Sequence, residues 1–297
     1  MPVVWRFIDG KPGHERQTAG FIKALKETSP CTVVEVSAVG GKPYWSWLTK
    51  RYPKLEPLPD LIIGAGSACQ APMLAARRTH GGKTIYFMRP KFPVGCFDLC
   101  VIPKHDRPPK HEKIAETEGV LNDFESAAQK KPLCGVILIG GPSKHHGWDT
   151  TNLSGQVKYL VDNSPERRYI LSASRRTPRE AIPSLENIAN LDYHAVEKTN
   201  SDWLPATLAV TDTVWVTPDS VSMMYEALSV GANLGVFEMP LKGNDRITRI
   251  SQDLIARGYA TAFSQWRDTN TLLKSPTLRE ANRIATEVKI RFPQIFG

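Results

Sequence analysis

The residues best suited to chemistry lie where a predicted strand passes directly into a predicted helix, in the run TPDSVSMMYEALSVG. The strand ends at Thr217, and Asp219 and Ser220 occupy the short loop before the helix. Main-chain N–H groups at a helix start attract anions, so those of Ser220 and Val221, with the Ser220 hydroxyl, could hold a diphosphate. The alternative is structural, because serine or aspartate before a helix is most often only a cap.

The same predicted helix carries a carboxylate about two turns from its start. Glu226 follows Met223 by three positions, and a carboxylate there could accept hydrogen bonds from both hydroxyl groups of a ribose. Together with a diphosphate contact, this arrangement would suit a nucleotide. The alternative is that Glu226 is solvated, as most glutamates in a surface helix are.

Two further loops of the second half follow predicted strands and could add to a phosphate site. The run GGPSKHHGW supplies Ser143 together with Gly140 and Gly141, which let the backbone approach a ligand closely. It has neither GxGxxG spacing nor the GK[ST] ending of a P-loop, which disfavours dinucleotide enzymes and NTPases. The run SASRRTP supplies Ser174 and an arginine pair that begins at Arg175. Arginine could bind the oxygens of a departing diphosphate, although ordinary surface basicity is equally open.

The first half offers a candidate general base and several cations on loops expected at one sheet edge. His14 lies just ahead of a helical pattern, after the predicted strand of residues 3–9. A histidine that titrates near neutrality can take the proton of an attacking hydroxyl, which contributes roughly 10²–10⁴ in rate. The alternatives are a structural histidine or a phosphate contact. Arg89, Lys91 and His105 lie on later loops and could bind an acceptor or a phosphate.

No metal site and no bound cofactor are predicted. The chain has no DxD motif and no acidic cluster of the kind that holds Mg²⁺. Its five cysteines are odd in number and scattered, which indicates buried thiols rather than a disulfide framework. Cys96 and Cys100 precede His105, but no second ligand pair accompanies them, so a zinc site is disfavoured.

The net charge of +8 indicates an anionic partner. Nucleic acid, an anionic membrane and a phosphorylated substrate all fit that charge, but no nucleic-acid module is recognisable, so no nucleic acid is expected. The run PYWSWLTKRY, residues 43–52, could seat on an anionic membrane surface or pack as core. Because no apolar run approaches about 18 residues and no signal pattern opens the chain, we expect a cytoplasmic protein, with peripheral attachment to the inner membrane face as an option.

Strand-like runs alternate with helical patterns along the whole chain, which is typical of parallel βαβ units. The charged stretch at residues 110–132 interrupts this rhythm, so we predict two Rossmann-like α/β domains, residues 1–125 and 126–297. An amphipathic pattern over residues 277–292 predicts a terminal helix that needs a partner surface. The predicted strands lie within residues 3–9, 32–39, 60–66, 83–88, 98–103, 133–141, 168–174, 212–220 and 233–240.

The motifs DGKPGH, RPKFP, IPKHD, IGGPSKHHGW, SRRTP and TPDSVSM occur in this order over nearly the whole chain. As a set they resemble the glycosyltransferase family related to the plant mitochondrial-fission Elm proteins. The second half is also similar in pattern to the sugar-nucleotide domain of the peptidoglycan glucosaminyltransferase. The resemblance implies a GT-B fold, an active site in the cleft between two domains, no need for a metal, and a C-terminal helix that crosses back to the N-terminal domain.

The resemblance also implies roles for residues. It implies a donor loop at Gly140, Gly141 and Ser143, a phosphate contact at Ser220, a ribose contact at Glu226 and a base at His14. The loop GKPGH departs from the GTGGH-type run of the wider class, since Pro12 restricts the backbone before His14. The complete predicted donor set is Gly140, Gly141, Ser143, Ser174, Arg175, Asp219, Ser220, Val221, Met223 and Glu226.

We therefore predict a glycosyltransferase that moves a sugar from a nucleoside-diphosphate sugar to a hydroxyl acceptor, such as a lipid-linked or cell-envelope glycan. The nucleotide sugar is a co-substrate and no other cofactor is implied. Two alternatives remain open. One is a sugar-nucleotide epimerase of the same fold, and the other is a non-catalytic adaptor at a membrane surface.

Overall fold

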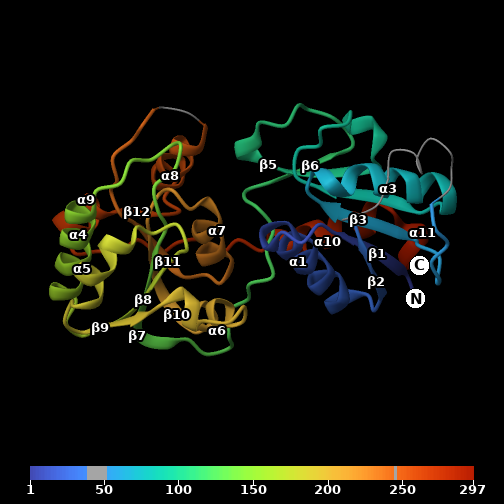
Figure 1. Ribbon diagram of the computed structural model, residues 1–297. Coiled ribbons are helices and arrows are strands. Elements are labelled where there is room, and N and C mark those ends of the chain that lie inside the picture. Colours follow the sequence, from blue (N-terminus) through green and yellow to red (C-terminus); the bar gives the residue numbers. More distant parts are fainter. Residues whose placement is uncertain (39–51, 244–245) are drawn as a thin grey trace. The chain divides into compact units, whose positions relative to one another are not determined.

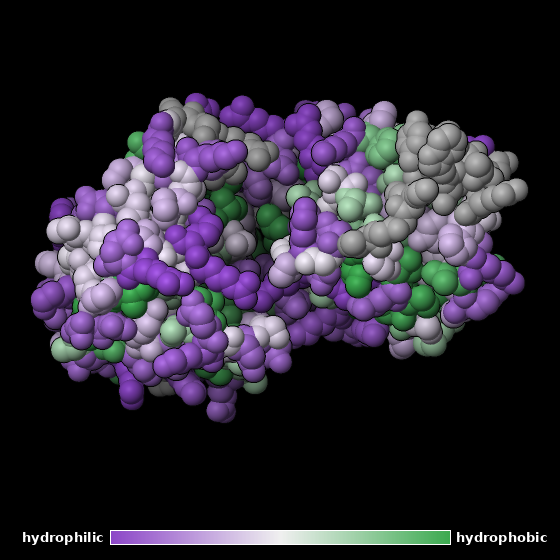
Figure 2. Space-filling view, viewed as in Figure 1, coloured by the Kyte–Doolittle hydropathy of each residue, from purple (hydrophilic) through white to green (hydrophobic). Residues whose placement is uncertain are grey.

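The computed structural model describes residues 1–38, 52–243 and 246–297, and these form two compact units (Figure 1). The first unit comprises Met1–Asp123 and Arg279–Gly297, and the second comprises Phe124–Leu278. Apart from Tyr52, the aromatic run at residues 43–52 lies outside the described residues, so its predicted membrane contact stays a prediction. On the face shown in Figure 2, hydrophilic residues cover most of each unit, and apolar residues are exposed in small patches.

The first unit is built on a six-stranded parallel sheet with the strand order β2-β1-β3-β4-β5-β6. Its strands are β1 (Val3–Ile8), β2 (Thr32–Ser37), β3 (Leu61–Ala65), β4 (Lys83–Phe87), β5 (Leu99–Pro103) and β6 (Ile114–Thr117). Its helices are α1 (Pro12–Thr28), α3 (Ser67–His80), α10 (Glu280–Arg291) and α11 (Pro293–Phe296), with the single turns η1 (Val94–Cys96) and η2 (Lys104–Asp106).

Both faces of this sheet are covered, which explains the near-continuous apolar runs of its central strands. Side chains alternate between the faces along each strand. Ile63 packs with α1 and α10, while its neighbour Ile62 packs with α3 on the other face. All five residues of β3 are buried as a result.

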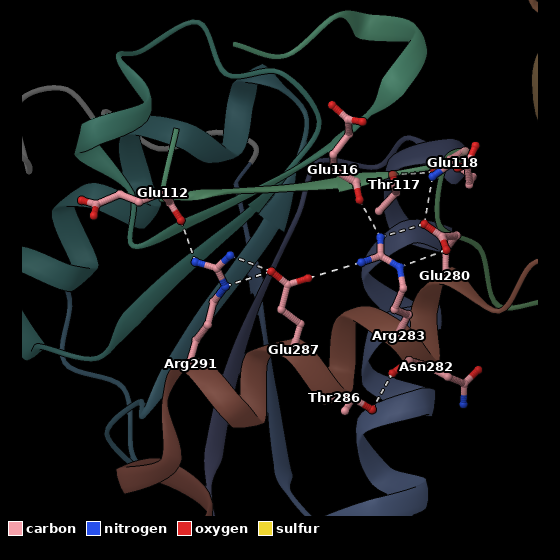
Figure 3. A network of polar contacts seen from close by, with 11 residues as sticks. Glu112, Glu116, Thr117, Glu118, Glu280, Asn282, Arg283, Thr286, Glu287 and Arg291 are labelled. Atoms are coloured by element: carbon pink, nitrogen blue, oxygen red, sulfur yellow. Dashed lines mark hydrogen bonds and ion pairs between the residues drawn. The ribbon is translucent and has the colours of Figure 1, made fainter. Parts of the chain in front are cut away.

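The C-terminal helix α10 returns to the first unit, so the predicted crossing of the terminal helix is confirmed. Its buried residues Ile284 and Val288 join the core cluster that contains α1. Its polar side chains bind the main chain at the edge of the sheet, as Figure 3 shows. Arg283 donates to the carbonyl of Glu116 in β6, and Arg291 Nη1 donates to the carbonyl of Glu112 at 2.6 Å. The helix thereby covers main-chain groups that an edge strand would otherwise leave open.

The second unit has a six-stranded parallel sheet with the order β12-β11-β10-β7-β8-β9. Its strands are β7 (Lys131–Ile139), β8 (Arg168–Ala173), β9 (Leu191–His194), β10 (Thr211–Val216), β11 (Asn233–Val236) and β12 (Thr261–Ala262). Its helices are α4 (Thr150–Asp162), α5 (Ile182–Glu186), α6 (Trp203–Ala209), α7 (Val221–Ser229), α8 (Arg246–Ala256) and α9 (Phe263–Thr269), with the turns η3 (Arg179–Ala181) and η4 (Val196–Lys198).

Two core clusters cover the two faces of the second sheet. Leu138 and Val214 pack with α7 and α8 on one face. Ile137 and Trp215 pack with α4, α5 and α9 on the other face. The prediction of two Rossmann-like parallel sheets is therefore confirmed.

Each sheet has one point at which the strand order reverses direction. In the first sheet the chain runs from β1 outward to β2, then returns to the other side of β1 with β3. In the second it runs from β7 through β8 to β9, then returns beside β7 with β10. Ligands of open parallel sheets bind beyond the carboxyl ends of the strands at such switch points. The loops after β1 and β3, and those after β7 and β10, are therefore where sites are expected.

Candidate functional site

The loops after β7 and β10 meet at the switch point of the second sheet. The Gly140 N–H donates to the Thr217 hydroxyl at 2.8 Å, and the Gly141 N–H donates to Asp219 Oδ2 at 3.0 Å. A Cβ atom on Gly140 would lie 2.2 Å from the same Asp219 oxygen. The Asp219 side chain therefore occupies the space beside Gly140 and requires a glycine there, while the approach of this backbone to a ligand stays a prediction.

Asp219 and Arg176 form an ion pair at this point. Arg176 Nη2 donates to Asp219 Oδ2 at 2.8 Å; the Asp219 side chain is 2% exposed and that of Arg176 is 48% exposed. The carboxylate next to the start of α7 is thus neutralised by an arginine that still reaches solvent. Sequence reasoning had favoured Arg175 of the arginine pair, and no sequence signal distinguishes the two.

Two serines predicted to bind the donor use their hydroxyl groups locally. Ser143 Oγ accepts the N–H groups of His145 at 3.1 Å and His146 at 3.0 Å, which closes the turn after β7. Ser174 Oγ accepts the Arg176 N–H at 3.2 Å. Both serines therefore shape loops at the predicted site. Their hydroxyl groups could bind a ligand only with the hydrogen-bonding capacity that these turns leave unused.

Binding of a diphosphate at the start of α7 stays a prediction, and the Ser220 N–H itself donates to the Thr217 carbonyl at 3.4 Å. Ser220 is the N-cap and makes no side-chain capping bond, although it is only 7% exposed. Val221 opens the helix, and Met223 packs at its margin against the core. Glu226 is 8% exposed. The alternative of a solvated glutamate is therefore wrong.

A cavity of about 730 Å³ adjoins these loops, between the carboxyl ends of β8 and β9 and the segments η3, α5 and η4. This volume is in the range of small-molecule sites. Arg175 lines the cavity, whereas Arg176 binds Asp219, so the two arginines lie in different environments. Polar and apolar groups both line it, including Ser174, Arg175, Thr177, Tyr193, Ala195 and Lys198.

At the switch point of the first sheet, His14 is paired with a buried carboxylate. His14 Nδ1 lies 2.8 Å from Asp9 Oδ2, and the side chains are 21% and 1% exposed. With the proton on Nδ1 donated to Asp9, Nε2 is left as the acceptor of the ring. This is the arrangement of an oriented general base. Sequence reasoning missed Asp9, although its place at the end of β1, five residues before His14, was a usable signal.

The loop that carries His14 is well braced. The Asp9 carboxylate also accepts the Lys11 N–H at 3.2 Å, and Glu15 accepts the Gly10 N–H at 2.9 Å. Pro12 is the first residue of α1. Proline is favoured there because its fixed φ suits the helix and its missing N–H has no helical partner, so the departure from a GTGGH-type loop is compatible with the helix start.

The other predicted residues of the first half lie on the loops after β4 and β5. Arg89 Nη1 donates to the Asp106 carbonyl at 3.1 Å, and the main-chain N–H of Lys91 donates to Gln70 Oε1 at 3.0 Å. His105 Nε2 lies 3.7 Å from Asp106 Oδ1. Because all these strands are parallel, their carboxyl ends share one sheet edge with His14.

Neither a cluster of metal ligands nor a membrane-spanning helix occurs in the described ranges. They contain no group of three or more His, Cys, Asp or Glu side chains that could hold a metal ion. In the same part of the chain, no helix combines the length and the apolar character needed to cross a bilayer.

Substituting Gly66, in the loop after β3, is expected to disturb His14. Its φ is +87°, and a Cβ atom would lie 2.3 Å from His14 Nδ1. Gly66→Ala should lower the free energy of unfolding by about 2–4 kcal/mol, because the cost of the left-handed backbone and the cost of the clash with His14 are added together. Gly10→Ala is the matched control, since Gly10 has φ +75° but nothing within 4 Å, and should cost only about 1–2 kcal/mol. Chemical unfolding and the NMR signals of the His14 ring test this; equal shifts of those signals in both variants would contradict it.

Two parallel Rossmann-like sheets, each with a switch point at its carboxyl edge, define the GT-B class of fold. The chain belongs to the mitochondrial fission ELM1 family, which matches residues 12–292. The resemblance seen in the motifs is thereby confirmed. Neither finding by itself names a reaction.

Individual relatives are distant. The uncharacterized protein RP120 of Rickettsia prowazekii (strain Madrid E) is 22% identical, over 96% of this chain and 97% of its own length. A solved UDP-N-acetylglucosamine 2-epimerase aligns with a TM-score of 0.58 and 14% identity, over 99% of this chain and 96% of that one. The solved glycotransferase of kitacinnamycin aligns with a TM-score of 0.57 and 12% identity, over 98% and 99%. At such identities the likeness concerns the fold.

Proposed function

We propose that this protein transfers a sugar from a nucleoside-diphosphate sugar to a hydroxyl group of an acceptor. The observation that carries the proposal is the start of α7, where Ser220 has no capping bond and the buried Glu226 follows two turns later. The main-chain N–H groups there suit a diphosphate, and a buried carboxylate suits the hydroxyl groups of a ribose. The cavity of about 730 Å³ beside the loop after β8 has room for the rest of a nucleoside.

In the proposed reaction the acceptor oxygen attacks the anomeric carbon of the sugar, and the bond from that carbon to the diphosphate breaks. Nε2 of His14 takes the proton of the acceptor hydroxyl, while Asp9 holds the ring and stabilises the imidazolium that forms. The Ser220 hydroxyl, the Val221 N–H and the Arg176 guanidinium stabilise the charge on the leaving diphosphate. The nucleoside diphosphate leaves with the electron pair of the broken bond.

An epimerase of the same fold is the second candidate. The structural alignment to a UDP-N-acetylglucosamine 2-epimerase has a TM-score of 0.58, and the alignment to a glycotransferase has one of 0.57, so the fold does not separate the two reactions. Incubation with the nucleotide sugar alone does separate them. An epimerase returns an altered sugar nucleotide, whereas a transferase without acceptor leaves it unchanged or slowly hydrolysed.

The nucleotide site is tested by calorimetry with uridine diphosphate, the nucleotide part of the substrate in that epimerase's name. Glu226→Ala should weaken UDP binding about tenfold, because the ribose loses a charged acceptor. His14→Ala should leave the dissociation constant within about twofold, since the base does not touch the nucleotide in this scheme. Glu166→Ala, which removes an exposed carboxylate of the same unit, is the matched control and should also have little effect.

Equal weakening by the Glu226 and His14 variants would contradict this division of roles. Failure of every common nucleoside diphosphate to bind would remove the transferase and the epimerase together. Vesicle binding that persists in Glu226→Ala, without nucleotide binding, would then favour a membrane-surface adaptor.

A further inference from the structure

The loop after β4, residues 88–93, is held more firmly than an ordinary surface loop. The side chain of Gln70 in α3 is buried, with 1% of the residue exposed. Its Oε1 accepts the N–H groups of both Lys91 at 3.0 Å and Phe92 at 3.1 Å, and its Nε2 donates to the Tyr86 hydroxyl at 2.8 Å. A buried amide that makes three such hydrogen bonds holds a loop in one conformation.

The same loop begins with a strained residue. Met88 has φ 95°, a value that costs a residue with a side chain about 1–3 kcal/mol. The strain is imposed by bonds on both sides, since the Met88 N–H donates to the Val101 carbonyl at 2.8 Å while Gln70 holds the following residues. Such strain collects where a side chain must be presented to a ligand. Here the strained residue directly precedes the exposed Arg89.

The side chains that this loop presents are cationic. Arg89 and Lys91 are exposed, and so is Arg107 on the loop after β5. Arg89 joins the two loops through the Asp106 carbonyl. Among the residues that the structure describes, no carboxylate forms an ion pair with any of these three cations. The loop that carries Arg89 and Lys91 is therefore held in place, and the charge of these side chains is available to a ligand.

We propose that Arg89 and Lys91 bind a phosphate group of the acceptor. Only the identification of this ligand as the acceptor rests on the proposed transfer. The planar guanidinium of Arg89 matches two phosphate oxygens, and Lys91 adds a second charge. β3 alone separates β1 from β4, and neighbouring strands lie 4.7–4.9 Å apart, so this loop begins about 10 Å from the end of β1 that carries the His14 pair. Arg89 and Lys91 therefore lie on the same edge of the sheet as the His14 pair.

The test uses the full chain with excess UDP present, so that the nucleotide site does not compete for phosphate. One arm titrates glucose 6-phosphate, with glucose as the uncharged control. The other measures sedimentation with phosphatidylcholine vesicles that contain undecaprenyl phosphate, with plain vesicles as control. The double variant Arg89→Gln with Lys91→Gln should weaken binding at least about tenfold in one of the two arms. The arm that responds tells whether the phosphate is free or membrane-borne.

Two further variants separate a specific site from general basicity. Lys23→Gln with Lys26→Gln removes the same charge from exposed positions of α1 and should leave binding within about twofold. Gln70→Met keeps the charge but releases the loop, and should weaken phosphate binding severalfold if it folds. Equal loss in the α1 variant, or no binding of wild-type protein in either arm, overturns the proposal.

UDP affinity, measured in parallel, keeps this proposal separate from the proposed function. If UDP does not bind but phosphate binding still depends on Arg89 and Lys91, the phosphate site stands and the transfer reaction falls. If UDP binds as expected while phosphate binding is absent or insensitive to these residues, the phosphate site falls alone.

Discussion

Replacement of His14 by alanine is expected to lower the turnover number of sugar transfer by roughly 10²–10⁴, with little change in UDP affinity. The physical reason is the geometry of the ring. Asp9 Oδ2 lies 2.8 Å from Nδ1, and a neutral ring that donates from Nδ1 to this carboxylate presents Nε2 as the acceptor for the hydroxyl proton. Initial rates at saturating nucleotide sugar, together with calorimetry of the same variant, measure the two quantities separately.

Asp9→Asn gives the matched test of how the ring is held. Asparagine can keep a hydrogen bond to Nδ1 but removes the charge that stabilises the imidazolium, and its amide also permits the wrong tautomer. Turnover should fall by about 10² while UDP affinity is unchanged. A His14→Ala enzyme with near-normal turnover would refute the base assignment. An Asp9→Asn enzyme with normal turnover would show that the pair only stabilises the loop.

The strands that the sequence predicts are those whose own residues form apolar runs. All nine predicted runs form strands, while three short strands, β6, β9 and β12, were not predicted. β6 has the sequence IAET and lies in the charged stretch that was predicted as a boundary without a strand. Its pairing depends on β5 and on the side chains of α10, and neither is visible in a local pattern. Edge strands of this length are specified by their neighbours.

The site shows a similar division. The sequence predicts which loops gather at the carboxyl edge of each sheet, because loops after parallel strands must lie at one edge. It could not predict which side chains meet, since Asp9 with His14, and Arg176 with Asp219, are pairings made by tertiary packing. Gly140 illustrates the difference. Its type signalled a close approach, but only the structure identifies Asp219 as the group that approaches.

Arg176→Ala is expected to weaken UDP binding about a hundredfold, close to 2.7 kcal/mol. Asp219 is 2% exposed and stands next to the start of α7, where the diphosphate is proposed to bind. With Arg176 in place its charge is neutralised, and the guanidinium still faces solvent. Without Arg176 the carboxylate is buried, unpaired and close to a second anion, which is costly in a poorly solvated site.

The double variant Arg176→Ala with Asp219→Asn tests whether Arg176 acts by neutralising the charge of Asp219. Asp219→Asn retains an acceptor for the Gly141 N–H but removes the charge, so alone it should leave UDP affinity unchanged or slightly higher. Added to Arg176→Ala, it should recover about tenfold of the lost affinity, a coupling of about 1.4 kcal/mol. Arg175→Ala is the matched control, since Arg175 lines the neighbouring cavity, and should weaken binding less than tenfold. If the single and double Arg176 variants lose affinity equally, charge neutralisation is not the role of the pair, and Arg176 acts on the diphosphate only directly or through the shape of the loop.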